Sequence, residues 1–350
     1  MLSQCLAPPS EWSVYVQDAA WLPHVYDVRR DTLTFAHMPR EAQQRAVFLD
    51  PRFVTRGQLS PAAPVLDLPA CEIEEAKGPI HFIFHTAFCC STLLTRALDQ
   101  PGLSMGLKEP AVLVSFAEYW SRSRRTPGAF AGLETTLNLL SRPLTQGETQ
   151  IVKPSNVANH IIPQFLHARP DAKALVLYSG LDAFLRAIAR RGIDGRLFAR
   201  QVFQQFEPVI PLDSGFARED VLLHTDLQIA AEAWLMQATF LDKLAQRFPQ
   251  RVRTLSSDSF LADTAGAMTK LGAFFGLQGD AARWQATATS PIFSEHAKEY
   301  GRAFDAGAYR AQHDQAAATY GAELRATRDW AHALAEQCNA PLTLGETLLA

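Results

Sequence analysis

Ser91 and Thr92 are the residues of this sequence whose position points most clearly to chemistry. They follow an apolar run at 80–84 and a connecting segment at 85–90, and a helical pattern begins directly at them. A turn between a buried strand and the start of a helix aims several backbone N–H groups at one point, where the helix dipole adds partial positive charge. Two hydroxyl groups there add further donors. The pattern predicts a site that binds an anion such as a phosphate group.

The standard phosphate-binding loop of nucleotide-binding proteins, G-x-x-x-x-G-K-[ST], is matched only in part. His85 and Cys90 stand at its two glycines and Ser91 stands at its lysine, so that Thr92 alone agrees with it. A buried strand followed by a core helix, with Ser91 and Thr92 as ordinary helix caps, is therefore the competing interpretation.

Five apolar, β-rich segments alternate with helical patterns from residue 80 onward. Such alternation predicts right-handed crossovers and a parallel sheet that is covered by helices on both faces. Ligands bind such sheets at the carboxyl ends of the strands. The expected strands are Ile80–Phe84, Leu103–Leu107, Thr149–Val152, Ala174–Tyr178 and Val252–Leu255.

The expected strand ends carry residues that are suited to group transfer. The first three ends deliver His85, Glu109 and Lys153, and the fourth delivers Ser179. A carboxylate that faces an anion loop can remove the proton of an acceptor, and a lysine can neutralise developing charge. The sequence leaves alternatives open, namely a salt bridge of Glu109 with Lys108 or Lys153 and a purely structural role for His85.

The order of several short motifs resembles that of the sulfotransferase family, whose members carry a P-loop-like fold and use 3′-phosphoadenosine 5′-phosphosulfate (PAPS). The resemblance spans roughly Gly78 to Gly301. In this family the loop before the helix typically ends in Thr-Thr, a Glu-Pro pair follows the next strand, and a Pro-Asp-Ala-Lys segment precedes the strand before the 3′-phosphate site. The matching segments are Ser91-Thr92-Leu93-Leu94, Lys108-Glu109-Pro110, Ile151–Ser155, Pro170-Asp171-Ala172-Lys173 and Leu255–Asp263.

The resemblance implies a three-layer α/β fold with a mostly parallel central sheet and helices on both faces. It also implies transfer of a sulfuryl group from PAPS to a hydroxyl or amine of a small acceptor, which the sequence does not identify, without a metal. In several family members the glutamate of the Glu-Pro pair is the general base. That role falls to Glu109 here, and Lys153 and His85 would supply positive charge or a hydrogen bond to the transferring group.

The cofactor-binding residues that the resemblance implies form two groups. Those expected around the phosphosulfate are Thr86, Ala87, Phe88, Cys89, Cys90, Ser91 and Thr92. Those expected around the 3′-phosphate are Ser179, Arg186, Arg190 and Lys298. A solvated basic face is the alternative for Arg186 and Arg190, and a surface pair with Glu295 is the alternative for Lys298.

Three positions depart from the pattern of the family. Phe88 stands where a Lys or Arg is usual, Ser179-Gly180-Leu181-Asp182 stands where Arg-Asp-Pro is usual, and Ala187 replaces a serine. These changes remove positive charge and a hydroxyl group from the donor pocket. A catalytically inert member that binds a nucleotide or a partner is therefore one alternative. A nucleotide-dependent, kinase-like phosphotransferase is a second, which the missing P-loop lysine disfavours.

Composition and cysteine usage limit the classes of function. A formal net charge of −3, with 20% charged residues, gives no general attraction for nucleic acid or an anionic membrane. We expect neither a membrane span nor a secretion signal, because no apolar run has the required length or position. Five cysteines without Cys-x-x-Cys spacing predict free thiols and a cytoplasmic protein. The adjacent Cys89 and Cys90, at a helix start, also permit a reactive thiolate.

The chain divides by composition into three parts. We expect an N-terminal extension and linker at 1–77, a sulfotransferase-like α/β domain at 78–340, and a C-terminal tail at 341–350 that frays. Asp226 is expected to cap a long helix, and Gly192 is expected to end the helix that begins at Asp182. Residues that contact the acceptor are expected in the insertions 127–147 and 192–223.

Overall fold

A central parallel sheet organises the larger part of the molecule. The computed structural model describes residues 10–122, 127–295 and 306–349. The five-stranded sheet has the order β5-β6-β4-β7-β8, and all of its neighbouring strands are parallel. Its strands are β4 (Ile80–His85), β5 (Ser104–Lys108), β6 (Thr149–Lys153), β7 (Ala174–Tyr178) and β8 (Val252–Ser256). The five strands predicted from the sequence are confirmed, with their ends within one residue.

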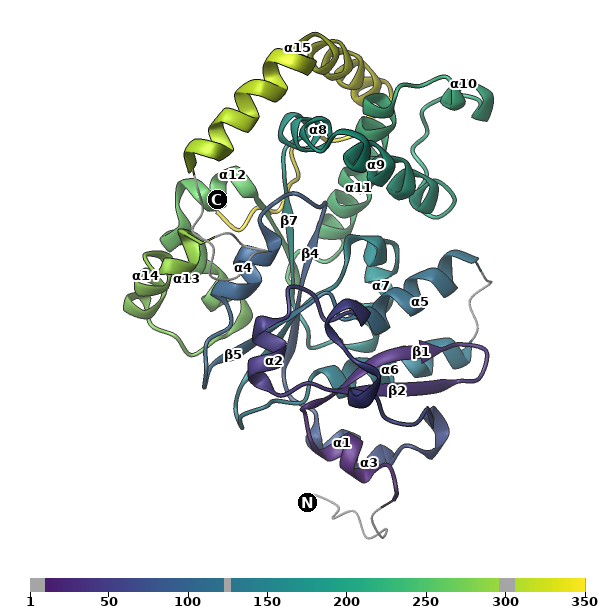
Figure 1. The fold of residues 1–350 in the computed structure, drawn as a ribbon, viewed down its shortest axis with the longest axis vertical. Coiled ribbons are helices and arrows are strands. Elements are labelled where there is room, and N and C mark those ends of the chain that lie inside the picture. Colours follow the sequence, from purple (N-terminus) through teal and green to yellow (C-terminus); the bar gives the residue numbers. More distant parts are fainter. Residues whose placement is uncertain (1–9, 123–126, 296–305, 350) are drawn as a thin grey trace.

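Two hydrophobic cores lie on opposite faces of this sheet. In β4, Phe82 and Phe84 belong to one core and Ile83 to the other, because successive side chains of a strand point to opposite faces. Figure 1 shows the two helical layers that cover these faces. One layer contains α4 (Ser91–Ala97), α12 (Ser257–Ala262), α13 (Thr264–Phe275) and α14 (Ala281–Ala288). The other contains α5 (Ala111–Arg122), α6 (Pro127–Leu140), α7 (Ile162–Ala168), α8 (Leu181–Arg190) and α11 (Asp226–Arg247). The predicted three-layer α/β class is confirmed.

Further helices lie above the ends of β4 and β7, at the top of Figure 1. They are α9 (Gly192–Phe206), α10 (Arg218–Leu222) and α15 (Ala306–Gln337). Gly192 breaks the helix as expected, with a left-handed φ of 57°, but α9 begins at the same residue. The cap of α11 was predicted one residue too late, because the Thr225 side chain accepts the N–H of Gln228 and Asp226 is already helical. Among the described residues, no helix is long and apolar enough to cross a membrane.

The N-terminal part packs against the α5 side of the sheet domain. Tyr26 stacks on Phe116 of α5 with 4.3 Å between the ring centroids, and both rings belong to the same hydrophobic core. The expected extension therefore shares the core of the α/β domain. Its elements are α1 (Ser13–Gln17), α2 (Arg40–Arg45), α3 (Ala70–Ala76) and an antiparallel sheet of β1 (Trp21–Asp27), β2 (Thr32–His37) and β3 (Ala63–Pro64).

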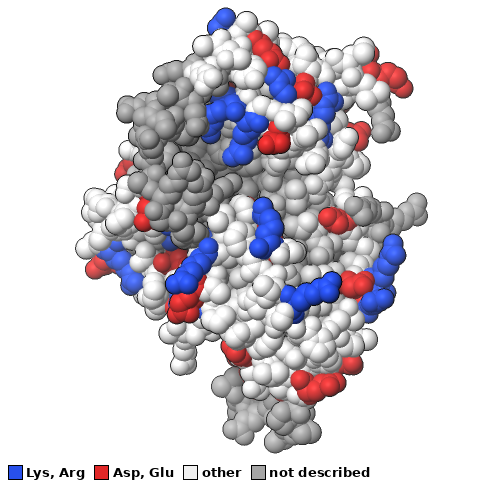
Figure 2. Space-filling model, in the orientation of Figure 1, with Lys and Arg blue, Asp and Glu red and all other residues white. Residues whose placement is uncertain are grey.

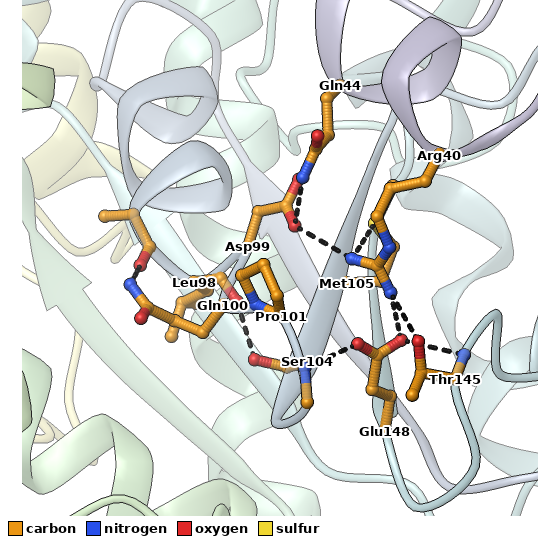
Figure 3. Close-up of polar contacts among 12 residues, drawn as sticks. Arg40, Gln44, Leu98, Asp99, Gln100, Pro101, Ser104, Met105, Thr145 and Glu148 are labelled. Atoms are coloured by element: carbon orange, nitrogen blue, oxygen red, sulfur yellow. Dashed lines mark hydrogen bonds and ion pairs between the residues drawn. The ribbon is translucent and has the colours of Figure 1, made fainter.

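A polar network ties α2 to the amino-terminal ends of β5 and β6. Figure 3 shows Arg40 and Gln44 reaching from α2 toward Asp99 and Glu148. The Arg40 guanidinium donates to the buried Glu148 carboxylate, which also accepts the backbone N–H of Gly102 (2.7 Å). Gln44 donates to Asp99 (3.2 Å), whose pKa burial raises. Because its buried carboxylates are met by donors, we assign this network to the docking of α2.

The C-terminal tail is ordered against β8, which contradicts the expected fraying. The backbone N–H of Thr254 donates to the carbonyl of Glu346 (3.0 Å), and that of Leu348 donates back to the carbonyl of Thr254 (2.8 Å). The side chain of Leu344 is buried. The edge of the sheet thus gains a short parallel pairing, which supplies partners that an exposed strand edge would lack.

Protonation of His81 links the stability of the fold to pH. Its buried ring accepts the backbone N–H of Lys173 at Nδ1 (3.1 Å) and donates from Nε2 to the carbonyl of Phe275 (2.8 Å). Burial lowers the pKa of His81 to about 4, so the folded protein keeps the ring neutral where the unfolded chain already binds a proton. The free energy of unfolding is expected to fall as the pH drops below about 6.5, with a loss of about 2 kcal/mol at pH 5.

Urea unfolding at pH 7.5 and at pH 5.0 measures this loss. The variant His81→Gln, whose side chain takes up no proton in this range, is expected to lose less stability between the two pH values than the wild type. Equal losses in the two proteins would show that other groups cause the acid sensitivity.

Candidate functional site

The segment between β4 and α4 has the backbone of an anion-binding loop. Ala87, Phe88 and Cys90 adopt left-handed conformations, with φ of 72°, 52° and 63°. Such residues turn neighbouring N–H groups toward one concave side, which is how backbone nests bind anions. Non-glycine residues hold this conformation only where the surroundings enforce it, and such strain concentrates at functional sites.

Ser91 and Thr92 are the first two residues of α4. Cys90 precedes them at the N-cap position, and its side chain makes no capping hydrogen bond. The interpretation of the two hydroxyls as helix caps is therefore wrong, and both side chains are buried beside the loop. Gly106 lets α4 lie this close to β5, because a Cβ atom there would overlap the carbonyl oxygen of Thr95.

Thr86 and Ser179 join the loop to the end of β7. The backbone N–H of Ser179 donates to Thr86 Oγ1 (3.3 Å), and Ser179 Oγ donates to the carbonyl of Ala87 (3.4 Å). The carbonyl of Ser179 accepts Trp234 Nε1–H (2.9 Å). This geometry uses the polar groups of both residues within the fold, so it supports a structural role for them in place of the predicted anion contacts.

Glu109, Lys153 and His85 meet at the carboxyl ends of the neighbouring strands β5, β6 and β4. Lys153 Nζ donates to Glu109 Oε1 and lies 3.5 Å from His85 Nε2, which is 4.0 Å from the same carboxylate oxygen. Lys153 is fully buried, whereas 21% of the Glu109 side chain is exposed. The structure therefore brings the three predicted catalytic residues together, and Glu109 is the member that faces solvent.

His85 holds the loop in place through its ring. Nδ1 accepts the backbone N–H of Ala87 (3.1 Å), which requires Nδ1 to be unprotonated. The neutral ring then carries its proton on Nε2, the nitrogen that faces Glu109 and Lys153. Protonation of the ring would break the bond to Ala87. The geometry favours the predicted hydrogen-bond donor over the predicted cation.

The N-terminal part supplies a wall of the site, which sequence reasoning missed. The backbone N–H of Leu49 donates to the carbonyl of Lys108 (2.7 Å), and Lys153 Nζ lies 5.4 Å from the centre of the Phe48 ring. Burial lowers the pKa of Lys108, whose ammonium group donates to the carbonyl of Gln44, to about 8. In the sequence, residues 48–52 show only a turn, so no local pattern reveals this role.

A cavity of about 610 Å³ opens at Glu109. The N-terminal part and the α/β domain line it from opposite sides, so a molecule inside would contact both. Its lining residues are His24, Val25, Asp50, Pro51, Arg52, Glu109, Ala111, Val114, Ser115, Glu118 and Ser155. Neither insertion that was expected to contact the acceptor appears among these residues.

Arg191 brings a positive charge to the loop at the position of Phe88. Its guanidinium lies 4.7 Å from the centre of the Phe88 ring, which also packs against Phe184 and Phe198. Burial, together with the neighbouring Arg190, lowers the pKa of Arg191. Among the described residues, no carboxylate lies within ion-pair distance of its guanidinium. The sequence signal was present in the Arg190-Arg191 pair, but only the fold stacks Arg191 on Phe88.

The other predicted contacts of the 3′-phosphate are less well placed. Figure 2 shows Lys and Arg side chains gathered beside a hollow in the upper part of this face. Arg186 is exposed on α8 and Arg190 is half-buried at its end, and Ala187 is buried. Lys298 lies outside the described residues. The structure therefore leaves open the solvated basic face as an alternative for Arg186 and Arg190.

Cys89 is not the reactive thiol that its position suggested. Its side chain is buried, Sγ lies 3.2 Å from the carbonyl oxygen of Leu177, and burial raises its pKa to about 12. A thiol in this state is a poor nucleophile. Iodoacetamide at pH 8 is expected to modify the exposed Cys71 and to leave Cys89 unmodified in the folded protein.

Peptide mass mapping after a timed reaction measures this difference. Unfolding in urea before labelling is the control, because it should make Cys89 react as readily as Cys71. Rapid labelling of Cys89 in the native protein would restore the reactive-thiol hypothesis.

Comparison of the sequence with protein-family models and with curated proteins finds no match. Among solved structures, the chain is similar to a sulfotransferase domain from the curacin biosynthetic pathway, at 10% identity and a TM-score of 0.42, over 76% of this chain and 99% of that chain. It is also similar to a sulfotransferase domain from the Synechococcus PCC 7002 olefin synthase, at 14% identity and a TM-score of 0.35, over 70% of this chain and 95% of that chain. At these identities and TM-scores, neither likeness carries an argument about activity, cofactor or acceptor. Both matched chains are sulfotransferase domains, the family that the sequence motifs resemble.

Proposed function

We propose that this protein transfers a sulfuryl group from PAPS to a hydroxyl or amine of an acceptor molecule. The observation that carries the proposal is the Glu109–Lys153 pair, which stands with His85 at three adjacent strand ends beside the left-handed loop. In the proposal, the carboxylate removes a proton and the ammonium group neutralises charge beside the loop that would bind the anion.

The residues around the loop fit the phosphosulfate end of such a donor. When bound, PAPS supplies a sulfuryl group attached to a phosphate leaving group. The backbone of 87–90 and the hydroxyls of Ser91 and Thr92 provide hydrogen-bond donors, and Lys153 and Arg191 provide positive charge. Charge-assisted hydrogen bonds of this kind are stronger than neutral ones.

Each residue of the cluster has a separate task in the proposed reaction. Glu109, the exposed member, accepts the proton of the acceptor hydroxyl or amine on its carboxylate. Lys153 holds that carboxylate in place and offsets negative charge that develops near the loop. His85 positions the loop through Ala87 N and directs its Nε2 proton toward the same space.

An inert nucleotide-binding protein is the alternative that a specific observation favours. Ser179 and Thr86 satisfy each other and the loop, so two of the predicted anion contacts are occupied by the protein itself. A site of that kind would bind the nucleotide weakly and would show no dependence on its 3′-phosphate.

Calorimetric titration with 3′-phosphoadenosine 5′-phosphate (PAP) tests the proposal, with ADP and AMP titrated at the same salt concentration. We expect micromolar binding of PAP and much weaker binding of the two nucleotides that lack a 3′-phosphate. Equal affinity for PAP and ADP, or no binding of PAP, would refute the assignment to PAPS. A positive result justifies an acceptor screen that follows the release of PAP.

A further inference from the structure

Three neighbouring cavities, each sharing lining residues with the next, lie in a row that begins at Glu109. The first, of about 610 Å³, contains Glu109 itself. The second, of about 430 Å³, shares Val114 and Glu118 with the first. The third, of about 390 Å³, shares Gln204 with the second. An elongated molecule that extends along the row would contact all three cavities.

The helix α5 forms one side of the first two cavities. Its residues Ala111, Val114, Ser115, Glu118 and Ser121 line them in succession. This spacing of three and four residues places the five side chains on one face of the helix. The opposite side of the second cavity is α9, which lies above α5 in Figure 1. The groove therefore leads from the candidate base along α5 toward α9.

The middle of the groove is polar and carries no cation among its described lining residues. Gln201 and Gln204 are exposed there, and Gln205 donates to the carbonyl of Val157 (3.0 Å). The carboxylate of Glu118 stands where the first two cavities meet. These groups favour a hydrogen-bonding segment such as an amide.

The far cavity, between α9, α10 and α11, suits an apolar group. Eight of its thirteen lining residues are apolar, and two of its three charged residues are paired within the protein, whereas the third, Glu207, is exposed to solvent. Glu232, whose pKa burial raises, is bonded to His224, and Arg200 is bonded to Asp226. An apolar occupant therefore leaves neither Glu232 nor Arg200 without a charged partner. The apolar lining residues are Phe203, Pro211, Leu212, Phe216, Val221, Leu222, Ile229 and Met236.

Leu222, the last residue of α10, lines the cavity, whereas the next residue, Leu223, does not. Leu222 is 74% exposed and Leu223 is 84% exposed. Exposed apolar side chains that rim a cavity are typical of binding sites. Substitutions of the two leucines provide a test variant and its control, because both side chains can change without disturbing a packed core.

We propose that the acceptor is an elongated amphipathic molecule. Its hydroxyl or amine lies at Glu109, its hydrogen-bonding middle lies between α5 and α9, and its apolar end fills the cavity at Leu222. The assignment of the reacting end rests on the proposed sulfuryl transfer, whereas the occupation of the groove is an independent matter of binding.

A series of N-acylethanolamines, from acetyl to decanoyl, tests the proposal. Each carries a terminal hydroxyl, an amide and an apolar tail of adjustable length. Calorimetric titration of the full-length protein, below the micelle concentration and with and without PAP, measures their affinities. We expect the affinity to rise with tail length by roughly two- to fourfold per methylene, until the far cavity is filled.

The variants Leu222→Asp and Leu223→Asp locate the tail. Leu222→Asp is expected to weaken decanoyl binding about tenfold, which is the loss of two to three of these methylene increments. It should not change the affinity for the shortest member that binds, and Leu223→Asp should leave the whole series unchanged. Absence of binding, an affinity that does not depend on tail length, or equal effects of the two variants would each overturn the proposal.

The two proposals fail in different ways. If PAP does not bind but the length dependence and the effect of Leu222→Asp persist, the proposed sulfuryl transfer is wrong and the groove remains. If PAP binds with the expected selectivity but the tail length has no effect, only the groove proposal is wrong.

Discussion

Glu109→Gln is expected to slow sulfuryl transfer about 10²- to 10⁴-fold, the usual contribution of a general base. The amide oxygen still accepts a hydrogen bond from Lys153 Nζ, so the cluster keeps its geometry while it loses the group that takes up the proton. The affinity for PAP should not fall, because Glu109 contributes no positive charge to the loop. Release of PAP from PAPS, with an acceptor found by the screen, measures the rate, and calorimetry measures the affinity.

Two further variants make this result interpretable. Glu134→Gln on α6, an exposed carboxylate outside the site, should leave the rate unchanged. Both Glu109 variants remove the counter-charge of the fully buried Lys153 ammonium group, but Glu109→Ala also removes its hydrogen-bond acceptor. A charge left without such an acceptor costs about 3 kcal/mol or more in stability, so Glu109→Ala should unfold at clearly lower urea concentration than Glu109→Gln. A full transfer rate in folded Glu109→Gln protein would remove Glu109 from the mechanism.

Arg191→Gln is expected to weaken PAP binding roughly 10- to 100-fold, the range for loss of a hydrogen bond to a charged group. The guanidinium lies over the ring of Phe88 and, among the described residues, forms no ion pair, although Asp194 acts on it at longer range. Its charge is therefore available to an anion at the loop. The pKa of Arg191 is lowered by burial and by the adjacent positive charge of Arg190. The negative charge of a bound phosphate would offset both the burial of the Arg191 charge and its repulsion by Arg190.

Arg191→Lys separates charge from geometry. Lysine retains the positive charge but lacks the planar group that lies on an aromatic ring and binds an anion through two nitrogens, so an intermediate affinity is expected. Arg29→Gln, in an exposed turn of the N-terminal part, removes the same charge far from the site and should have no effect. If Arg29→Gln and Arg191→Gln weaken binding equally, the effect reflects net charge, and Arg191 does not contact the nucleotide.

The burial of Lys153 explains why the cluster needs its three members together. A fully buried ammonium group requires a partner, and Glu109 is that partner in this structure. His85 and the ring of Phe48 complete its surroundings. The charged pair is therefore expected to contribute to stability as well as to the proposed catalysis. Conservative variants are needed to separate the two effects.

The five strands were accessible from sequence because their signals are local. Buried parallel strands are short apolar runs, and all five were found. The carboxyl ends of parallel strands lie at one edge of the sheet, so His85, Glu109 and Lys153 were expected at that edge. Only the structure shows that β5, β6 and β4 are neighbours. Smaller features that depend on one residue, such as the cap at Thr225, were misplaced because neighbouring residues can serve the same purpose.

Features that depend on contacts between distant segments could not be predicted. The C-terminal tail at 341–350 was expected to fray, yet it pairs with Thr254 of β8. The pattern of 1–77 indicated only an extension, yet Phe48 and Leu49 lie against the strand ends that carry Lys153 and Glu109. Hydrogen bonds and ring contacts of this kind depend on three-dimensional proximity and leave no periodic pattern in the chain.

By itself the sequence determined the α/β class, the position of the loop before α4 and the three residues at the strand ends, because hydrophobic periodicity and strand connectivity fix these. Only the tertiary structure decided that Cys89 is an inert buried thiol, that Ser179 and Thr86 satisfy each other, and that Arg191 lies on Phe88. The physical reason is that burial, pairing and charge are properties of a side chain's surroundings, and packing between segments distant in the chain creates those surroundings.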